Sequence, residues 1–260
     1  MRLLTWNILH GGGPRRIPEI ALSILGHTPD VVVLTEFRPG RGGQIRGVLS
    51  DHGLGHQLAS VTPERANGLL IASRWPLAAL SIAPPTPELT PKWLATDVLT
   101  PSGPVALLGV HIPDDSRPTA KAVFWRRVVE VGREWSGRAA IIAGDLNTGR
   151  HRVDEEGSTF GCTTAMGELW TAGFRDTYRE RHPEGRDTSW TSHEERGFRV
   201  DAVWASPALA AAVVLATYSQ EERIARTSDH APLVVEWGDF RTNFDSKCKN
   251  PVENCQKTLF

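Results

Sequence analysis

The sequence predicts an α/β protein, a four-layered α/β sandwich in which two mixed β-sheets pack face to face with helices outside. Short apolar runs of strand length alternate with helical patterns from one end of the chain to the other. The chain has 260 residues and is 40% hydrophobic, which is enough for a sizeable core. Ten candidate strands against four candidate helices are too many for one doubly wound sheet, whereas two facing sheets accommodate them.

The candidate strands are short runs rich in β-branched and other apolar residues. Residues 31–34 and 139–142 have the continuous apolar character of strands that are buried on both faces. Strands are expected at residues 2–8, 31–35, 54–60, 68–73, 93–99, 105–112, 139–144, 198–205, 213–218 and 233–237.

Four segments show a helical pattern instead. The longest, residues 119–135, places Trp125, Val128 and Val129 on one apolar stripe with charged residues on the other side. Helices are expected at residues 18–25, 44–49, 119–135 and 163–172.

No internal repeat or low-complexity linker divides the chain, so we expect one domain over residues 1–238. Residues 239–260 are polar, mixed in charge and without periodicity, and we expect them to form a C-terminal tail. A strand pattern begins at Arg2, which leads us to expect no signal peptide and a cytoplasmic location.

Composition excludes several classes of protein. No apolar run approaches the roughly 20 residues that span a bilayer. Three cysteines are too few for a disulfide framework or a zinc site. The formal net charge of −1 excludes a protein that coats nucleic acid through overall positive charge, so any basic face has to be local. We expect a monomer.

Five short polar clusters stand at the ends of apolar runs. Asn7 follows the first run, and Glu36 follows residues 31–34. Strand ends are where side chains can face a ligand, and carboxylates and carboxamides gathered at one edge make an oxygen-rich site of the kind that Mg²⁺ or Mn²⁺ prefers. The other clusters are Gly144-Asp145-Leu146-Asn147 after residues 139–142, Arg199-Val200-Asp201 before residues 202–204, and Ser228-Asp229-His230 before residues 233–235.

These residue types suit the hydrolysis of a phosphoester. The reaction brings a water oxygen onto a phosphorus atom that is shielded by negative oxygens, and it requires positive charge, a positioned water and a stabilised leaving alkoxide. A divalent cation held by carboxylates supplies the charge, a neighbouring carboxylate positions the water, and Asn and His donors assist the rest. The clusters therefore indicate an enzyme that cleaves phosphoesters and depends on Mg²⁺ or Mn²⁺.

The order and spelling of the clusters resemble the endonuclease/exonuclease/phosphatase superfamily, which includes deoxyribonuclease I, exonuclease III and abasic-site endonucleases. The resemblance covers residues 1–237 and implies the deoxyribonuclease I-like fold. Any one motif is weak, but five in the right order are a strong signal. The matching motifs are Thr5-Trp6-Asn7, Leu34-Thr35-Glu36, Gly144-Asp145-Leu146-Asn147, Arg199-Val200-Asp201 and Ser228-Asp229-His230-Ala231-Pro232-Leu233.

The resemblance also implies a set of metal ligands. Glu36 looks like the principal ligand, Asn7 lies beside it, and Asp229 completes the metal site.

It implies catalytic roles for five further residues. Asp145 looks like the residue that orients and deprotonates the attacking water, and Asn147 would hold Asp145 and a phosphoryl oxygen. His230 would bind or protonate the phosphoryl group while Asp201 accepts its other ring N–H. His111 stands where the superfamily carries a His or Tyr that contacts phosphate.

Residues 173–179, 189–191 and 197–199 look most similar to the exonuclease III and abasic-site branch. Trp190 and Phe198 are candidate substrate contacts, and Asn67 is a candidate near the metal edge. Ser189 stands where abasic-site enzymes carry a pocket aromatic. We expect a DNA endonuclease or exonuclease, of the kind that acts in DNA repair. The alternative is a phosphatase or phosphodiesterase acting on a nucleotide or a phospholipid headgroup, which the near-neutral charge and His111 favour.

Each candidate also has a purely structural interpretation. Asp201 can pair with Arg199 or Arg226 in place of His230, and His111 can be a hydrogen-bonded core histidine. A non-catalytic interaction domain can reuse the same fold, but it has no reason to keep the clusters together. We expect five tryptophans in the core: Trp6, Trp93, Trp125, Trp170 and Trp204.

Overall fold

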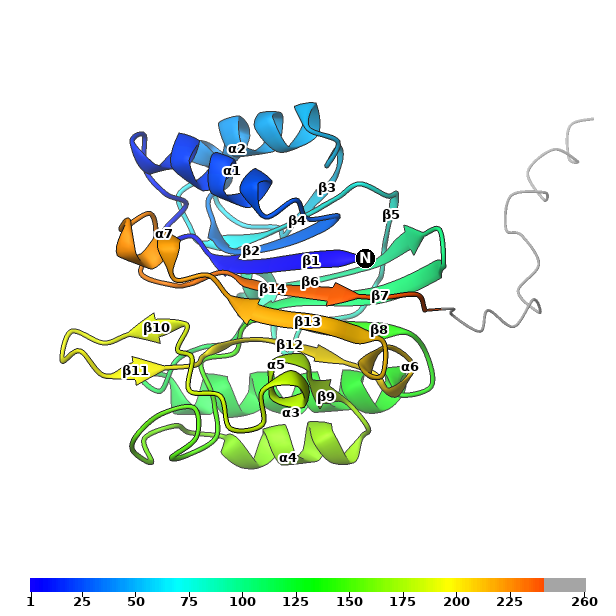
Figure 1. Ribbon diagram of the computed structural model, residues 1–260, viewed down its shortest axis with the longest axis vertical. Helices are drawn as coiled ribbons and strands as arrows, with labels where there is room; N and C mark the ends of the chain where they lie inside the picture. The colour runs from blue at the N-terminus through cyan, green and yellow to red at the C-terminus, as the bar shows by residue number, and fades with distance from the viewer. Residues whose placement is uncertain (241–260) are drawn as a thin grey trace, which may run out of the picture.

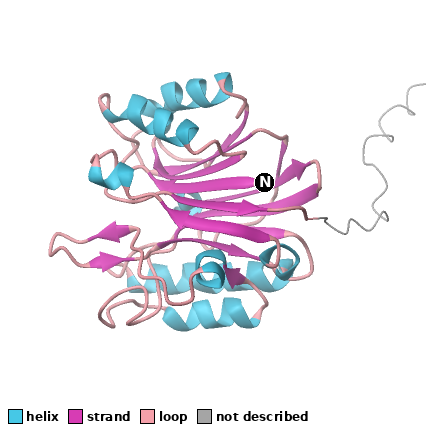
Figure 2. Ribbon diagram, in the orientation of Figure 1, coloured by secondary structure: helices cyan, strands magenta, loops and turns pink. Residues whose placement is uncertain are grey.

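The computed structural model describes residues 1–240. Two six-stranded sheets pack face to face, with the strand orders β13-β14-β1-β2-β4-β3 and β5-β6-β7-β8-β12-β9. Helices cover the outer face of each sheet (Figures 1 and 2). The predicted four-layered sandwich is therefore confirmed.

The strands of each sheet come from both halves of the chain. The first sheet consists of β1 (Arg2–Asn7), β2 (Val31–Phe37), β3 (His56–Ala59), β4 (Gly68–Ser73), β13 (Val213–Tyr218) and β14 (Leu233–Trp237). The second consists of β5 (Leu77–Ala79), β6 (Trp93–Thr100), β7 (Gly103–His111), β8 (Ala140–Asp145), β9 (Arg175–Asp176) and β12 (Asp201–Ala205). A separate ribbon pairs β10 (Trp190–Thr191) with β11 (Gly197–Phe198).

The longer helices form the two outer layers. In Figure 1, α1 and α2 lie against the first sheet, and α3 and α4 lie against the second. No helix within residues 1–240 is long and apolar enough to cross a membrane. The helices are α1 (Arg16–Gly26), α2 (Pro39–Asp51), α3 (Pro118–Trp135), α4 (Thr163–Thr171), α5 (Thr177–Arg181), α6 (Pro207–Ala210), α7 (Glu221–Ile224) and the 3₁₀ turn η1 (Pro87–Lys92).

Three apolar clusters hold these layers together. Leu3, Val33 and Ile141 belong to the cluster between the two sheets. Another cluster lies beneath α3 and contains Trp125, and a third lies beneath α1 and contains Trp6. Because each sheet is buried on both faces, its central strands are almost wholly apolar. Their continuous apolar runs therefore predict them from the sequence.

Several expected elements differ in detail. The strand expected at residues 198–205 is two strands, β11 and β12, because the buried Arg199 side chain between them hydrogen-bonds Asp154 and Asp176. The two-residue strands β9 and β10 and the short helices α5, α6 and α7 were not predicted. Trp170 was expected in the core and is 54% exposed, with the Arg175 guanidinium 5.1 Å from the centre of its ring. That expectation was wrong.

The expected C-terminal tail begins at residue 239. Phe240 is buried and belongs to the apolar cluster between the sheets. The rest of the expected tail lies outside the described residues.

Helix α7 is tied to α1 by a buried carboxylate. Ser23 Oγ donates to Glu222 Oε1 over 2.5 Å, and His27 Nε2 lies 2.7 Å from the same oxygen. Burial alone would raise the pKa of Glu222, but the hydrogen bonds from His27, Ser219 and Ser23 lower it to about 2. A carboxylate whose pKa is lower in the folded state stabilises the fold at any pH above the pKa that it has in the unfolded chain. That stability is lost as the pH falls through the folded pKa.

We expect Glu222→Gln to lower the free energy of unfolding at pH 7 by roughly 2–3 kcal/mol, since one pKa unit corresponds to about 1.4 kcal/mol. The difference from the unsubstituted protein should shrink between pH 4.5 and pH 2, where Glu222 takes up a proton. Urea unfolding at pH 7 and at pH 3 measures both values. A difference that stays the same at the two pH values would show that the charge of Glu222 does not contribute.

Candidate active site

The two sheets bring their polar strand ends to one edge of the molecule. In the first sheet β1 and β2 are parallel, with Asn7 opposite Thr35. In the second sheet β7 and β8 are parallel, with His111 opposite Asp145, and β12 places Asp201 opposite Asp145 from the other side. Parallel neighbours end at the same edge of a sheet, so these registers gather residues that are far apart in the sequence.

Asp145 lies at the centre of the gathered residues and is buried. Asn7 Nδ2 donates to Asp145 Oδ2 over 3.0 Å, and the backbone N–H of Asn147 donates to Asp145 Oδ1 over 3.0 Å. His111 Nε2 lies 3.7 Å from Asp145 Oδ2. Burial and the negative charge of Asp201 raise the pKa of Asp145 to about 7, although His230 acts in the opposite direction. Asp145 is thus a carboxylate able to exchange a proton near neutral pH.

Gly144 explains how Asp145 reaches this position. Gly144 has φ +140°, and a Cβ placed on it would lie 1.9 Å from the Val110 carbonyl oxygen. Only glycine allows β8 to approach the neighbouring backbone so closely, which accounts for the glycine in the motif.

His230 is paired with Asp201, and neither Arg199 nor Arg226 takes that place. His230 Nδ1 lies 2.7 Å from Asp201 Oδ2. Burial alone would lower the pKa of His230, but Asp201 and Asp145 together raise it to about 10. Because Asp201 accepts the proton on Nδ1, the Nε2–H is left to face a substrate.

The group of side chains close enough to share a metal ion differs from the expected ligand set. One ligand atom from each of Asp145, Asp201 and His230 falls within 4.8 Å of the others, which is close enough to hold a metal ion. Glu36 and Asp229 lie outside that group. Asp229 Oδ2 accepts from the Trp190 indole N–H over 3.2 Å.

Glu36 is presented by a bulge in β2. The register with β4 shifts between Thr35 and Phe37, and Glu36 itself has φ +58°. A bulge re-aims a side chain, and a non-glycine residue in the left-handed region is strained. The Glu36 carboxylate therefore turns out of the pleat toward His10, whose backbone N–H donates to Oε2 over 2.7 Å.

Two expected residues sit differently from their implied roles. Asn147 Nδ2 donates to Ile112 O over 2.8 Å, so the backbone N–H of Asn147, and not its side chain, holds Asp145. Asn67 contacts His10 and Arg38, accepting from Arg38 Nε over 2.7 Å, and within residues 1–240 its hydrogen bond to His10 is its link to the site.

Two lysines near the site were not predicted from any sequence pattern. Lys121 is completely buried, and its ammonium donates to Asn147 O over 2.6 Å and to Asp115 Oδ2 over 2.8 Å. The half-buried Lys92 has no hydrogen bond or ion pair to any residue in the range 1–240. Burial lowers its pKa, while the charges of Asp145 and Glu36 act to raise it. Lys92 is thus a cation free to meet an anionic ligand.

Aromatic side chains form one wall beside His230. The ring of Trp190 lies 6.3 Å from that of His230 and 5.6 Å from that of Phe198. Phe160, which sequence reasoning missed, continues the wall with its ring 5.7 Å from Phe198. Trp190 and Phe198 thus lie beside His230, and their contact with a substrate stays a prediction.

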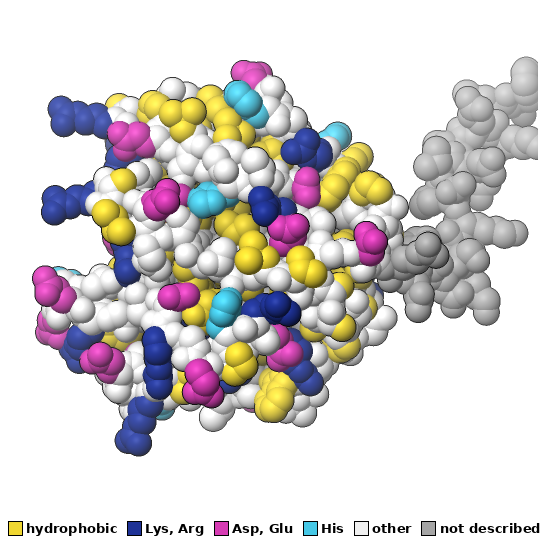
Figure 3. Space-filling model, viewed as in Figure 1, with side chains coloured by type: hydrophobic (Ala, Val, Ile, Leu, Met, Phe, Trp, Pro, Cys, Tyr) yellow, Lys and Arg dark blue, Asp and Glu magenta, His cyan; other side chains and the backbone are white. Residues whose placement is uncertain are grey.

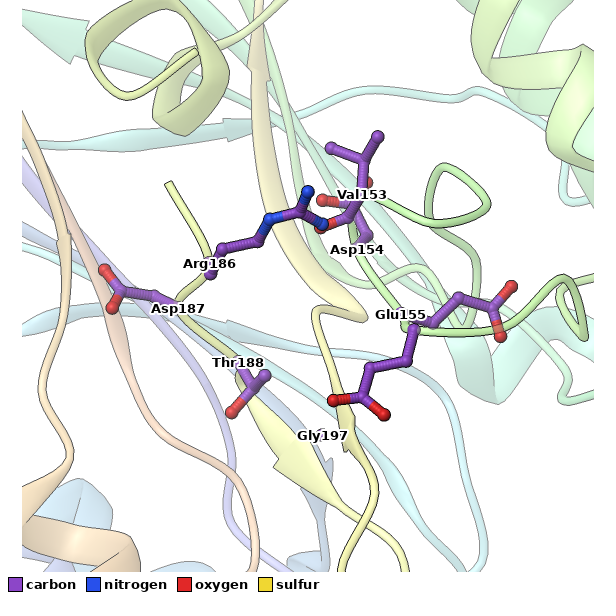
Figure 4. A pocket seen from close by; sticks show the side chains of 8 residues that line it. Val153, Asp154, Glu155, Arg186, Asp187, Thr188 and Gly197 are labelled. Atoms are coloured by element: carbon purple, nitrogen blue, oxygen red, sulfur yellow. The ribbon is translucent and has the colours of Figure 1, made fainter. Parts of the chain in front are cut away.

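A separate hollow of about 360 Å³ lies next to β11 (Figure 4). Two of its carboxylates are engaged: Asp154 accepts from Arg199 Nε over 2.7 Å, and Glu155 accepts from the backbone N–H of Thr159 over 2.8 Å. These two carboxylates serve the fold.

Comparison with known proteins agrees with this geometry. A family model described as the endonuclease/exonuclease/phosphatase family matches residues 4–230. No curated protein matches the chain.

Solved structures share the fold at low sequence identity. A 3'-5' exonuclease, NExo, from Neisseria meningitidis is 23% identical with a TM-score of 0.77, and the match covers 92% of this chain and 100% of that one. An AP endonuclease from Archaeoglobus fulgidus is 20% identical with a TM-score of 0.78, again over 92% and 100%. An endonuclease/exonuclease/phosphatase from Beutenbergia cavernae is 23% identical with a TM-score of 0.66, over 92% of this chain and 72% of that one. From the family match and the shared fold, this chain belongs to the endonuclease/exonuclease/phosphatase family.

Proposed function

We propose that the protein is a divalent-metal-dependent phosphodiesterase that hydrolyses DNA. The observation that carries the proposal is the buried group formed by Asp145, Asp201 and His230, whose ligand atoms lie within 4.8 Å of one another at the open edge of both sheets. A buried acid with a pKa of about 7 next to a histidine with a pKa of about 10 supplies a base and a cation in one place.

The donor set fits a hard divalent cation. Asp201 Oδ1 is buried and has no hydrogen-bond partner among the described residues, and two buried carboxylates this close together repel each other unless positive charge is added. A divalent cation beside these two carboxylates would supply that charge. We propose that Glu36, Asn7 and Asp229, the oxygen donors that the family resemblance implies, would hold Mg²⁺ or Mn²⁺ there. When bound, the ion neutralises charge on the phosphoryl oxygens.

The protein's own groups account for the other requirements. Asp145, held by the N–H groups of Asn7 and Asn147, takes the proton of the attacking water. His230, held by Asp201, directs its Nε2–H to a phosphoryl oxygen. Lys92, which lacks a paired acidic side chain within residues 1–240, adds positive charge that Asp145 and Glu36 sense.

Support for DNA as the substrate comes from Trp190 and Phe198, which are both partly exposed. Aromatic side chains stack on bases without regard to sequence, and these two rings lie 5.6 Å apart beside His230. NExo is also described as a 3' phosphatase bound to a product DNA hairpin. We propose a role in DNA repair on this basis.

A smaller phosphoester is the second candidate, supported by the net charge of −1 and by His111 in place of a tyrosine. A nucleotide needs no extended basic surface, whereas a nucleic acid gains affinity from every phosphate contact.

A substrate panel with Mg²⁺ and Mn²⁺ tests the proposal. We expect cleavage of duplex or abasic-site DNA that stops when excess chelator is added. We also expect the KM to rise with salt, because each phosphate contact adds about 0.9 to the slope of log KM against log salt concentration. RNA, single strands, nucleotides and simple phosphomonoesters complete the panel. Activity that persists in chelator would contradict the metal dependence, and a salt-independent KM with preference for a monoester would favour the second candidate.

A further inference from the structure

A cleft of about 460 Å³ adjoins the candidate metal site. It shares Asp229 with that site and lies between the turn after β1, helix α7 and the β10–β11 ribbon. None of the roles proposed above uses it. Its lining residues are Leu9, Thr191, Arg223, Ile224, Arg226, Ser228 and Asp229.

Arg223 is held in place on one side of the cleft. Its Nη1 donates to the hydroxyls of Thr191 and, over 3.3 Å, of Thr188. No carboxylate among residues 1–240 pairs with Arg223, so Nε and Nη2 keep their protons for another acceptor. Burial lowers the pKa of the guanidinium, yet an arginine stays charged at neutral pH. The result is an oriented cation with an open two-pronged edge, the geometry that binds phosphate.

The rest of the lining suits the organic part of a nucleotide. Ile224 is 80% exposed, although it is one of the larger apolar residues, and Leu9 is a second apolar residue in the lining. Arg226 is exposed and makes no ion pair with any described residue. In Figure 3, Lys and Arg side chains project from the edge of the molecule where α7 and the β10–β11 ribbon lie. Apolar contacts flanked by guanidinium groups fit a base or sugar that carries a phosphate.

We propose that this cleft binds the nucleotide next to the hydrolysed phosphodiester, with Arg223 holding the adjacent phosphate. The cleft is continuous with the candidate metal site through Asp229, so its occupant is part of the same substrate molecule. The proposal rests on the function proposed above and refines it: the preferred substrate is an oligonucleotide with a second phosphate one nucleotide away, and a lone phosphoester lacks that contact.

The test compares two kinds of substrate with Arg223→Met. One is a short DNA strand in which the phosphate beside the cleaved bond is either natural or replaced by an uncharged methylphosphonate, on each side in turn. The other is bis(p-nitrophenyl) phosphate, which has no second phosphate. We expect Arg223→Met to raise the KM for natural DNA about tenfold, because a hydrogen bond to a charged group is worth roughly a power of ten in affinity. The slope of log KM against log salt concentration for natural DNA should fall by about 0.7.

The same substitution should leave unchanged the small diester and one of the two methylphosphonate strands, the one whose neutral group takes the place of the phosphate that Arg223 holds. The other methylphosphonate strand should respond like natural DNA. Arg223→Lys, which keeps the charge but not the fork, should give an intermediate KM. Arg126→Met is the matched control, since Arg126 is an exposed arginine on α3. Thr191→Val keeps Arg223 but removes one anchoring hydroxyl, and it should raise KM for natural DNA by a smaller factor.

Equal losses on DNA and on the small diester would show that Arg223 only supports the fold, and would overturn the proposal. So would a natural strand and both methylphosphonate strands that respond alike to Arg223→Met. If the unsubstituted protein cleaves none of these substrates, the proposed function fails by itself. Equilibrium binding of the same strands, measured in chelator by fluorescence anisotropy, then decides the cleft: Arg223-dependent preference for the natural phosphate supports it, and no preference overturns it.

Discussion

Asp145→Asn is expected to lower kcat for DNA cleavage by about 10²–10⁴-fold, the range typical of losing a general base. The carboxamide keeps the shape of the side chain but cannot take a proton from water. Asp145 is buried, and burial together with Asp201 raises its pKa to about 7, so the carboxylate is a base matched to neutral solution. KM should change little, because Asp145 acts on the water and not on the bound strand. Initial rates over a range of DNA concentrations in Mg²⁺ separate the two constants.

Asp51→Asn provides the control for this substitution. Asp51 is an exposed carboxylate at the end of α2, so the same chemical change there should leave kcat and KM unaltered. Equal melting temperatures of the three proteins would show that folding is not the cause of a loss. A fully active Asp145→Asn protein would remove Asp145 from the mechanism.

Asp154→Ala is expected to reduce the free energy of unfolding by about 3–5 kcal/mol, the cost of removing one partner from a buried ion pair. Asp154 accepts hydrogen bonds from Arg199 Nε and from the guanidinium of Arg179, and all three side chains are buried. Asp176 also accepts from Arg199, over 2.6 Å. Without Asp154, Arg199 would keep only Asp176, and the buried Arg179 guanidinium would keep only carbonyl acceptors among the described residues. Burial would raise the pKa of Asp154, yet Arg199 and Arg179 bring it below its ordinary value, so the pair is ionised.

Chemical denaturation at pH 7 measures this loss directly. Glu194→Ala is the contrasting case, since Glu194 and its partner Arg196 are both exposed and exposed pairs contribute little. We expect no clear change in the denaturation midpoint for Glu194→Ala. A midpoint for Asp154→Ala that equals that of the unsubstituted protein would show that the interior network adds nothing to stability.

The layers of the fold were predictable because the central strands are apolar on both faces. Residues 213–218 and 233–237 were expected as strands, and the structure has them with the same bounds as β13 and β14. The short elements were not predictable, since two-residue strands such as β9 and four-residue helices such as α7 have no period to detect. Trp170 shows the limit of the apolar pattern, because one face of α4 carries it outward, where Arg175 covers it.

The candidate site residues could be identified in the sequence because they form polar clusters at the ends of apolar strands. The lysines that lie near them could not be identified in this way. Lys92 is a single lysine in a 3₁₀ turn, and Lys121 looks like any charged residue at the start of a helix. Only the packing of distant segments shows that the charge of Asp145 acts on Lys92 and that Lys121 donates to the carbonyl oxygen of Asn147. The bulge at Glu36 likewise depends on the register with β4, which no local pattern reveals.

The residues proposed for catalysis and metal binding are divided between the two halves of the sandwich: Asn7 and Glu36 extend from one sheet, and Asp145 and Asp201 from the other. Neither sheet alone carries all the residues proposed for the site. Any species in which the sheets have come apart, even with every strand intact, would have to be inert, so enzymatic turnover can serve as a reporter of sheet docking during refolding.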